Sequence, residues 1–413
     1  METVRIERLA AGGDGVARAS DGRTLFVPRT APGDLAAVEF SVSDKARFAR
    51  GRLLQLHESG PSRIDPPCAH YQLDGCGGCQ LQHLSIEAQR AAKAQIVVDA
   101  LARIARRQVA VPAVVPSPLD WGYRRKATFT VRASGGGFHT IEDPDALVSV
   151  TSCAITDPTV IAALCAARDA WEALPADREW RLSVRLLDGG GLGLLVEGGA
   201  AGGWSRFEAF AARVSMLSAI WWRPRDGARA VIVLDRRSST VHDAAPAFAQ
   251  VNAPLAEQLQ EDVCAAVMAS APIHVIDAYA GTGVFARRLA ARGVRATTIE
   301  RDAIAVDVAR RLDTPNVRLL EGAVEEQLAR ALPADVVVVN PPRTGLAPEI
   351  PPLLDAAQEV RLLVYVSCDP ATLARDVARL PNWAVEQVRC YDLFPQTAHV
   401  ETVMTLVPRE ERS

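Results

Sequence analysis

Apolar strands alternate with helices over residues 245–413 of this chain. The segments "HVIDAYAGTG", "ADVVVVNPPRTG" and "LLVYVSCDPATLARD" each run from an apolar strand into a turn, and the clearest of them continue into a helix. Uninterrupted apolar strands that alternate with helices are typical of a mostly parallel sheet covered on both faces. Such sheets bind ligands beyond the carboxyl ends of their strands. We therefore expect an α/β, Rossmann-like domain here, with its site at that edge.

The first 56 residues show a different pattern, in which apolar and polar positions alternate between glycine-containing turns. The turns "GGDG", "SDG" and "APGD" divide this stretch into several short strands. That pattern predicts a small closed or nearly closed β-barrel of the OB-like kind. The basic stretch "DKARFARGR" could face single-stranded nucleic acid on such a barrel. An exposed edge strand with solvated charges explains the same stretch equally well.

The middle of the chain, residues 57–244, combines both kinds of pattern. A cysteine-rich, loop-like segment leads into an amphipathic helix over 84–107, and a β-rich section with glycine hairpin tips follows. We expect an α+β central domain between a barrel at 1–56 and the α/β domain at 245–413. The helix over 84–107 is a candidate to pack on the third domain.

Length and charge limit the class of protein. A chain of 413 residues exceeds one compact core, and its hydrophobic content of 49% with 23% charged residues is that of a soluble globular protein. The net charge of −3 means that any nucleic-acid binding must come from local basic patches. Charges from the second residue onward and the lack of an apolar run of about 20 residues favour a cytoplasmic protein without a membrane partner. We take a monomer as the expected state.

The turn "DAYAGTG" after the strand "HVI" indicates a nucleoside-binding site. Gly281 and Gly283 allow a tight turn, but the third glycine of the dinucleotide fingerprint is missing. Asp277 at the strand end would repel a pyrophosphate and could hold a cationic amino-acid moiety. Glu300 ends the next strand, where a carboxylate can bond both ribose hydroxyls. The pattern favours S-adenosylmethionine over NAD.

Three further polar residues stand at strand ends. Asn340 in "NPPR" could hydrogen-bond a planar group. Cys368 in "YVSCDP" is either a buried packing residue or a nucleophile, and the helix that begins after it would favour a thiolate. Glu401 precedes the last apolar strand, where an acid is costly unless it is paired or has a function. His399 is expected on the same strand face. A solvated strand start is the alternative for Glu401.

Three cysteines crowd one short stretch with the spacing C-x7-C-x2-C. Clustering of this kind in a cytoplasmic chain indicates a metal site rather than a disulfide framework. Cys68, Cys76 and Cys79 suit tetrahedral zinc as well as an iron–sulfur cluster. Cys153 in "TSCAI" is the best candidate for a fourth ligand, with the less favoured alternatives His70 and His83.

Together these motifs resemble a known family. "GDGVAR", "LFVP" and "PGD", then "CGGCQLQH", "YRRKATF", "FAQVN", "DAYAGTG", "NPPRTG", "VSCDPATLARD" and "FPQTAHVE" occur in the family's order over nearly the whole chain. The chain resembles the bacterial RNA uracil-C5 methyltransferases, in particular the 23S rRNA enzymes that carry a TRAM domain and a [4Fe–4S] cluster. The resemblance implies a TRAM RNA-binding barrel at 1–56, a class I methyltransferase domain at 245–413, and iron–sulfur rather than zinc.

The resemblance also implies roles for individual residues. Cys368 would be the nucleophile and Glu401 the base that removes the C5 proton. This sequence departs from the family pattern at two positions. Many members have aspartate at the position of Asn340, and the rRNA branch can have asparagine at the position of Val284. The cofactor contacts would be Gln250, Tyr279, Gly281, Gly283, Glu300 and Asn340, and the cluster ligands Cys68, Cys76, Cys79 and Cys153.

The activity implied is methyl transfer from S-adenosylmethionine to C5 of a uridine in 23S rRNA. A tRNA T-loop uridine is the nearest alternative substrate. Some tRNA enzymes of this family lack the barrel and the cluster cysteines, so the presence of both in this sequence favours rRNA. A non-catalytic RNA-binding iron–sulfur protein is a second alternative. A radical-SAM methylthiolating enzyme would need a C-x3-C-x2-C triad, which the sequence lacks.

Overall fold

The computed structural model describes residues 1–40, 47–175, 177–187, 189–200, 204–225, 230–237 and 250–409. The expected domain boundary at 244/245, part of the basic stretch and one hairpin tip at Asp188 lie outside these ranges. The chain forms two compact units. The first comprises Met1–Ala92, Leu119–Pro246 and Phe394–Ala398, and the second comprises Lys93–Pro118, Ala247–Leu393 and His399–Ser413. The three domain ranges drawn from the sequence stay predictions.

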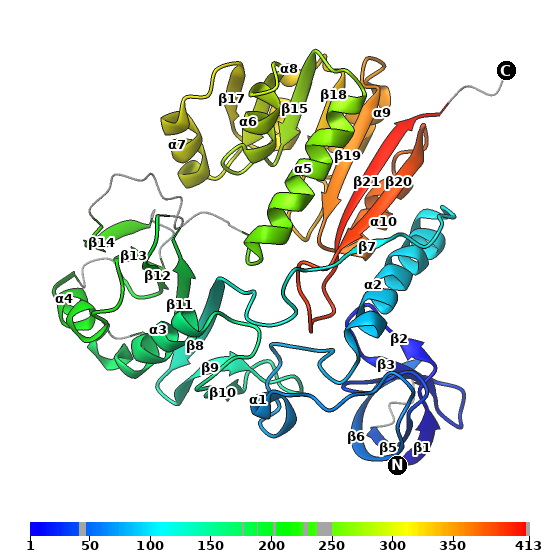
Figure 1. The fold of residues 1–413 in the computed structure, drawn as a ribbon, viewed down its shortest axis with the longest axis vertical. Coiled ribbons are helices and arrows are strands. Elements are labelled where there is room, and N and C mark those ends of the chain that lie inside the picture. Colours follow the sequence, from blue (N-terminus) through cyan, green and yellow to red (C-terminus); the bar gives the residue numbers. More distant parts are fainter. Residues whose placement is uncertain are drawn as a thin grey trace. The chain divides into compact units, whose positions relative to one another are not determined.

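The N-terminal part of the first unit is a strongly curved sheet of six short strands (Figure 1). Its order is β1-β5-β6-β4-β3-β2, and the Glu7 amide donates to the Val16 carbonyl (2.8 Å), which brings the chain after β1 against β3. Alternating apolar side chains such as Val4, Leu25 and Val38 fill the interior. The strands are β1 (Glu2–Arg5), β2 (Arg8–Leu9), β3 (Gly15–Arg18), β4 (Thr24–Val27), β5 (Leu35–Phe40) and β6 (Phe48–Glu58).

A seven-stranded sheet with helices makes up the rest of the first unit. Its order is β10-β9-β8-β11-β12-β13-β14, antiparallel except for the parallel pair β12–β13. Phe129, Leu182 and Phe207 lie in its core. The strands are β8 (Lys126–Arg132), β9 (Gly135–His139), β10 (Leu147–Val148), β11 (Glu179–Leu186), β12 (Leu192–Glu197), β13 (Ala219–Arg223) and β14 (Val231–Asp235); the helices are α1 (Ala69–Gln72), α3 (Pro158–Asp169), the 3-10 turn η2 (Trp171–Ala173) and α4 (Trp204–Arg213).

The second unit has an eight-stranded sheet in the order β17-β16-β15-β18-β19-β21-β20-β7. The five strands from β17 to β19 are parallel, as the apolar runs predicted, and β21 is antiparallel to both β19 and β20. The strands are β7 (Val114–Val115), β15 (His274–Ala278), β16 (Arg295–Glu300), β17 (Val317–Glu321), β18 (Val336–Val339), β19 (Leu362–Ser367), β20 (Trp383–Tyr391) and β21 (Glu401–Pro408).

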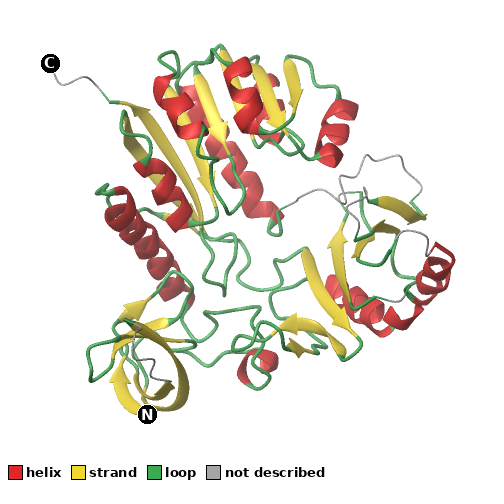
Figure 2. Ribbon diagram, turned by 180° about the vertical axis from the view of Figure 1, so that it is seen from behind, coloured by secondary structure: helices red, strands yellow, loops and turns green. Residues whose placement is uncertain are grey.

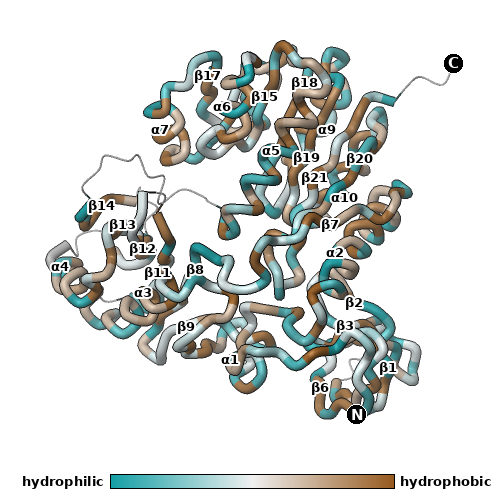
Figure 3. Tube along the Cα trace, viewed as in Figure 1, coloured by the Kyte–Doolittle hydropathy of each residue, from teal (hydrophilic) through white to brown (hydrophobic). Residues whose placement is uncertain are grey.

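Helices cover both faces of this sheet (Figures 1 and 2), so its central strands are apolar on both sides. All four residues of β18 are fully buried, and hydrophobic residues follow one another along β18 and β19 (Figure 3). Asp369 caps α10 by accepting a hydrogen bond from the Thr372 amide (2.8 Å), with Pro370 at the first helical position. The helices are α5 (Ala253–Ala269), α6 (Val284–Ala290), α7 (Ala303–Leu312), α8 (Val324–Ala331), α9 (Ile350–Ala356) and α10 (Pro370–Ala378).

The helix predicted over 84–107 is shorter and less simple than expected. It comprises α2 (Ile86–Ala100) and a π-helical turn η1 (Leu101–Ala105). Val97, Leu101 and Ala105 lie in the core of the second unit. The buried face of the helix is not purely apolar, because Lys93 is fully buried and its Nζ donates to the Asp392 carboxylate (2.6 Å). None of the described helices is long and apolar enough to cross a membrane.

Candidate active site and cysteine pocket

The carboxyl ends of the parallel strands bring the predicted site residues of the second unit to one edge. Ala278 pairs with Ile299 on one side and Val339 on the other, and Val339 pairs with Tyr365. The loops that follow β15, β16, β18 and β19 therefore begin at the same level of the sheet. They carry Tyr279, Gly281, Gly283, Asn340 and Cys368, and Glu300 is the last residue of β16.

Cys368 and Glu401 come together through the antiparallel pairing of β19 with β21. Ser367 pairs with Thr402, so the residue after Ser367 lies opposite the residue before Thr402. Cys368 is half-buried, and Glu401 is only 3% exposed. Burial raises the pKa of the Cys368 thiol most, and the charge of Glu401, when it is ionised, raises it further. The structure thus forms a thiol–carboxylate pair from residues that are far apart in the sequence.

Burial controls the protonation of this pair. It raises the pKa of Glu401 to about 8, although the nearby Arg343 guanidinium opposes the shift. Burial also raises the pKa of Cys368, with Glu401 as the next contribution. The start of α10 was expected to favour a thiolate; burial of Cys368 acts in the opposite direction. Both groups carry a proton near neutral pH.

Arg343 is the site residue that the sequence reasoning missed. It follows the two prolines after β18, and it lowers the pKa of both Glu401 and Cys368. Thr372 of α10 fixes this turn by donating to the Arg343 carbonyl (3.0 Å). An Arg343 nitrogen lies 3.4 Å from Nε2 of His399, which precedes β21 instead of lying on it as expected. A cation directly after the "NPP" turn was the available signal.

The glycine-containing turn after β15 has the tight shape that the sequence predicted. Tyr279, Gly281 and Gly283 have positive φ angles of 59°, 56° and 75°. The Gly281 amide donates to Oε2 of Glu300 (2.7 Å), and Oε1 of Glu300 accepts from the next two backbone amides, at 2.8 and 2.7 Å. Glu300 therefore holds the backbone of both loops that would surround a nucleoside.

Asp277 at the end of β15 shows what this site can bind. It is fully buried; Oδ2 accepts from the Ala286 amide (3.0 Å), and Oδ1 has no hydrogen-bond partner among the described residues. Burial, with the charge of Glu300 as a smaller contribution, raises the pKa of Asp277 to about 7. A buried carboxylate oxygen without a partner fits a cationic group such as the amino group of S-adenosylmethionine.

The two other predicted cofactor contacts are half-buried. Asn340 follows β18, and its backbone amide donates to the Ala278 carbonyl (3.2 Å), which keeps it beside the turn after β15. Gln250 lies three residues before the start of α5. A further buried residue, Asn252, directly precedes α5, and its side chain donates to Ser117 Oγ (2.9 Å) and the Leu393 carbonyl (3.3 Å).

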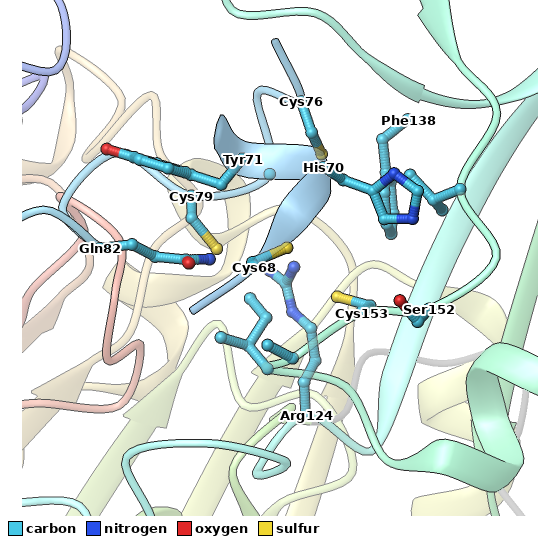
Figure 4. Close-up of a pocket in the computed structure, with 14 residues that line it drawn as sticks. Cys68, His70, Tyr71, Cys76, Cys79, Gln82, Arg124, Phe138, Ser152 and Cys153 are labelled. Carbon is cyan, nitrogen blue, oxygen red and sulfur yellow. The ribbon is translucent and has the colours of Figure 1, made fainter. Parts of the chain in front are cut away.

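The four cysteines proposed as ligands line one pocket in the first unit. Cys68, Cys76, Cys79 and Cys153 surround it together with His70, Arg124 and Phe138. Figure 4 shows the sulfur atoms of Cys68, Cys79 and Cys153 directed into the pocket, with the Arg124 guanidinium between them. Thr156 donates to the Cys153 sulfur (3.1 Å). No aspartate or glutamate is among the residues that line the pocket.

The chemistry of this pocket suits a cluster with several thiolates. The pKa of the Cys79 thiol is raised to about 12, mainly by burial, with Cys153 and Cys76 as smaller contributions in the same direction and Arg124 opposing them. Nε of Arg124 has no hydrogen-bond partner in the described part of the chain. Four sulfur donors beside one half-buried cation fit a bound group of negative charge. Over the described ranges, no set of three or more His, Cys, Asp or Glu side chains is arranged to hold a single metal ion.

The two histidines proposed as alternative ligands have other partners. His70 lines the pocket, but its Nδ1 lies 2.6 Å from an Asp74 oxygen, and its Nε2 accepts from the Thr151 amide (3.3 Å). His83 is buried outside the pocket lining, with Nδ1 2.7 Å from the Tyr71 hydroxyl. Cys153 is therefore a better candidate for the fourth ligand than either histidine, which is also the preference drawn from the sequence.

Comparison with known proteins places the chain in a family. Residues 2–54 match the model of the TRAM domain, and residues 316–409 match that of tRNA (Uracil-5-)-methyltransferase. An uncharacterized RNA methyltransferase of Rhizobium meliloti is 34% identical over 98% of this chain and 99% of its own. The 23S rRNA (uracil(1939)-C(5))-methyltransferase RlmD of Chromohalobacter salexigens is 31% identical over 97% of this chain and 88% of its own. The chain belongs to the RNA uracil-C5 methyltransferase family.

This RNA uracil-C5 methyltransferase also shares its fold with a solved enzyme. The tRNA (uracil-54, C5)-methyltransferase of Pyrococcus abyssi, in complex with S-adenosyl-L-homocysteine, matches with a TM-score of 0.70 and 24% identity over 98% of this chain and 100% of its own. The predicted TRAM domain and S-adenosylmethionine-dependent class I methyltransferase fold are thereby confirmed. The enzyme class predicted from the sequence is confirmed as well.

Proposed function

We propose that this enzyme transfers the methyl group of S-adenosylmethionine to C5 of a uridine in 23S rRNA, with Cys368 as nucleophile and Glu401 as base. The observation that carries the proposal is the β19–β21 register, which puts a thiol opposite a buried carboxylate at the ligand-binding edge of the sheet. Uracil C5 is too weak a nucleophile to take a methyl group unaided. A reaction at this carbon therefore needs both groups.

The steps follow from this need. The Cys368 thiolate adds to C6 and converts the ring to an enolate, whose C5 then attacks the sulfonium methyl group. C5 now carries both a methyl group and a proton. Glu401 removes that proton, the C5–C6 double bond forms again, and the Cys368 sulfur leaves C6. The nucleophile is regenerated, and the net products are 5-methyluridine, S-adenosylhomocysteine and a proton.

The protonation states of Cys368 and Glu401 set a condition on these reaction steps. Cys368 has to lose its proton before it attacks, and Glu401 has to be ionised when C5 is deprotonated, but burial raises the pKa of both. Arg343 opposes both shifts because its positive charge favours the two anions. The sulfonium cation of the methyl donor would act in the same direction. Binding of the methyl donor would thus prepare the pair for reaction.

The residues around the turn after β15 would hold the methyl donor. Asp277 offers its unpaired oxygen to the amino group. For the ribose hydroxyls, Glu300 would exchange part of its bonding with backbone amides. The remaining contacts that we propose come from Gln250, Tyr279, Gly281, Gly283 and Asn340.

Cys68, Cys76, Cys79 and Cys153 would hold a [4Fe–4S] cluster. The support is their position around one pocket with Arg124. A cluster extends over several atoms, so its four thiolates stand further apart than the ligands of one ion. Methyl transfer to uracil consumes no electrons, and the cluster would supply rigidity to the cysteine-rich loops rather than redox chemistry.

The RNA would be bound in part by the TRAM barrel. Phe48 on β6 is 62% exposed and packs edge-on against Phe26 with ring centroids 6.0 Å apart, and Arg50 and Arg52 on the same strand are exposed. An exposed aromatic ring beside arginines suits stacking on unpaired bases. A target uridine has to leave its stack to reach Cys368, so a loop or bulge is the expected substrate.

The choice of RNA follows the family relatives. The relative from Chromohalobacter salexigens acts on 23S rRNA, whereas the Pyrococcus abyssi enzyme acts on tRNA uracil-54. The greater identity and similar coverage favour 23S rRNA for this chain. A tRNA T-loop uridine is the alternative, because the archaeal fold match spans the whole chain.

The test uses total RNA from cells that lack this gene, incubated with the protein and methyl-labelled S-adenosylmethionine. We expect label at C5 of a uridine in the 23S rRNA fraction. Label in tRNA would keep the chemistry and overturn the substrate. With intact protein and no label in any fraction, the remaining alternative would be a non-catalytic RNA-binding protein.

A further inference from the structure

A short loop near the C-terminus, between two segments of the second unit, is grouped with the first unit. Phe394–Ala398 is grouped with the first unit, whereas Leu393 before it and His399 after it belong to the second. Glu401 follows only three residues after Ala398. Whatever holds this loop therefore constrains where β21 begins and where the Glu401 carboxylate is placed.

Gln396 at the centre of the loop is held in an unusual conformation. Its φ angle is 70°, a left-handed value that a residue with a side chain rarely adopts, and it is 3% exposed. Such conformations persist only where the surroundings enforce them, and they occur often at functional sites. Gln396 has no turn glycine beside it that would make the conformation easy. The contacts around it must supply the constraint.

Gln89 on α2 supplies most of that constraint. Its Oε1 accepts from the Gln396 backbone amide (2.9 Å), and its Nε2 donates to the Gln396 side-chain oxygen (2.8 Å). Nε2 of Gln89 also donates to the carbonyls of Leu81 and Leu84, at 3.1 and 3.0 Å. Gln89 is fully buried. One side-chain amide thus joins the loop to the segment that follows the cysteines.

The cysteine-rich segment completes the attachment. The backbone amides of Gln80 and Leu81, directly after Cys79, both donate to the Gln396 carbonyl, at 3.1 and 3.0 Å. The side-chain oxygen of Gln80 accepts from the Ala398 amide (3.3 Å). The loop is therefore hydrogen-bonded at two positions to residues adjacent to one of the pocket cysteines.

We propose that Gln396 is a positioning residue, through which Gln89 and the segment after Cys79 hold the loop that places Glu401. The proposal rests on the proposed function, because it assumes that Glu401 is the base and Cys368 the nucleophile. The loop would position Glu401 only. Cys368 directly follows β19 and stands two residues before α10, outside this loop, so its addition to C6 does not depend on the loop. Loss of the attachment is expected to slow removal of the C5 proton selectively.

Two RNA substrates separate the two steps. With uridine, turnover requires both addition by Cys368 and proton removal by Glu401. With 5-fluorouridine, addition and methyl transfer proceed. C5 then carries fluorine in place of the proton that the base would remove, so the covalent protein–RNA adduct persists. The rate at which this adduct forms reports on Cys368 alone.

The variants are Gln89→Met and Gln396→Met. Gln95→Met is the matched control on the exposed face of the same helix, where the Gln95 side chain donates to Asp99 (2.8 Å). We expect uridine turnover to fall by roughly 10- to 100-fold in the two test variants, as for a small displacement of a reacting group. Formation of the 5-fluorouridine adduct should stay within about twofold of wild type. The double variant should be no slower than Gln89→Met, because both changes break the same contact.

Each result decides the proposal. Equal losses with both substrates would mean that the loop supports the whole site and would overturn the positioning role, as would unchanged turnover. A variant that does not fold is recognised by its circular dichroism, and Gln396→Glu then replaces it, since it keeps the side-chain length and an acceptor for Gln89. Failure of the wild-type protein to form the adduct at all would contradict the proposed function, which is a separate outcome.

Discussion

Cysteine occurs at two very different sites in this molecule. Cys368 directly follows the carboxyl end of the inner strand β19 in the second unit, opposite a buried carboxylate and beside Arg343. Cys68, Cys76, Cys79 and Cys153 stand on loops around a pocket in the first unit, with one arginine and no carboxylate in its lining. Burial raises the pKa of Cys368 and of Cys79 alike.

The difference teaches that thiol acidity does not distinguish these roles, but the neighbouring groups do. The nucleophile that we propose must add and then leave, which needs a proton acceptor nearby, and Glu401 could be that group. The cysteines that we propose as ligands would be deprotonated when the metal binds, so their pocket would need no base. It would need positive charge to balance several thiolates, and Arg124 could supply it. The following predictions test this division.

The largest effect is expected from Cys368→Ala. Without the sulfur, C6 cannot be attacked and C5 stays unreactive, so methyl transfer to RNA should fall below detection. Iron content and S-adenosylmethionine binding should be those of wild type, because Cys368 does not line the cysteine pocket. Methylation that persists in this variant would contradict the role of Cys368, whatever the cluster does.

The second prediction concerns the pocket cysteines. The protein purified without oxygen should be brown and hold about four irons per chain, and Cys153→Ser should lose most of the iron. Cys165→Ser is the matched control: Cys165 is half-buried in α3 and donates to the Val150 carbonyl (3.4 Å), but it does not line the pocket. Iron analysis and visible absorption measure the outcome. A colourless wild-type protein that contains zinc would exclude the iron–sulfur assignment.

The fold was predictable where the signal is local. Apolar runs such as Val336–Val339 predicted a parallel sheet buried on both faces, and alternation predicted the barrel. The order of the strands and the antiparallel β21 were not predictable, because pairing depends on contacts between distant segments. The buried pair Lys93–Asp392 shows the same limit: its members are 299 positions apart, and a lysine on a helix is ordinarily expected in solvent.

The site residues divide in the same way. Strand-end residues such as Asp277, Asn340 and Cys368 could be located from the sequence because each follows an apolar run directly. Arg343 could not be assigned, since its relevance depends on which side chains face the turn after β18. Nothing in the letters around Gln396 indicates a left-handed backbone, which arises from hydrogen bonds to segments more than 300 residues earlier.

The third prediction tests the charge beside the nucleophile. Burial raises the pKa of Cys368 most; among the charged groups, Glu401 and Asp369 raise it and Arg343 lowers it. Since both reacting groups must ionise and both have raised pKa values, wild-type turnover should increase with pH through the neutral range. Arg343→Met should move this rise to higher pH and lower turnover at pH 7 by about tenfold for each unit of pKa change.

The control for this shift is Arg311→Met, an exposed arginine near the end of α7. It changes the net charge equally but should leave the pH profile in place. Arg343→Lys should restore part of the rate because it keeps the charge. A uniform loss for Arg343→Met at every pH would show that the arginine binds RNA and does not act on the two ionising groups.

The smallest effect is expected from the arginine on the other side of the comparison. Arg124 lies among the pocket cysteines, lowers the pKa of Cys79, and has one buried nitrogen without a hydrogen-bond partner in the described ranges. Removing this charge in Arg124→Met makes an added electron less favourable. The reduction potential of the bound cluster should become more negative by on the order of 50 mV, as for one charge at an effective dielectric constant of about 20.

Arg125→Met is the neighbouring control, since Arg125 does not line the pocket. An anaerobic titration followed by electron paramagnetic resonance measures the potential of each protein. Because the reaction transfers no electrons, methylation by Arg124→Met should change far less than the potential does. A potential that stays at the wild-type value would mean that Arg124 does not balance thiolate charge, and the contrast between a base beside Cys368 and a cation beside the other cysteines would then lose its second half.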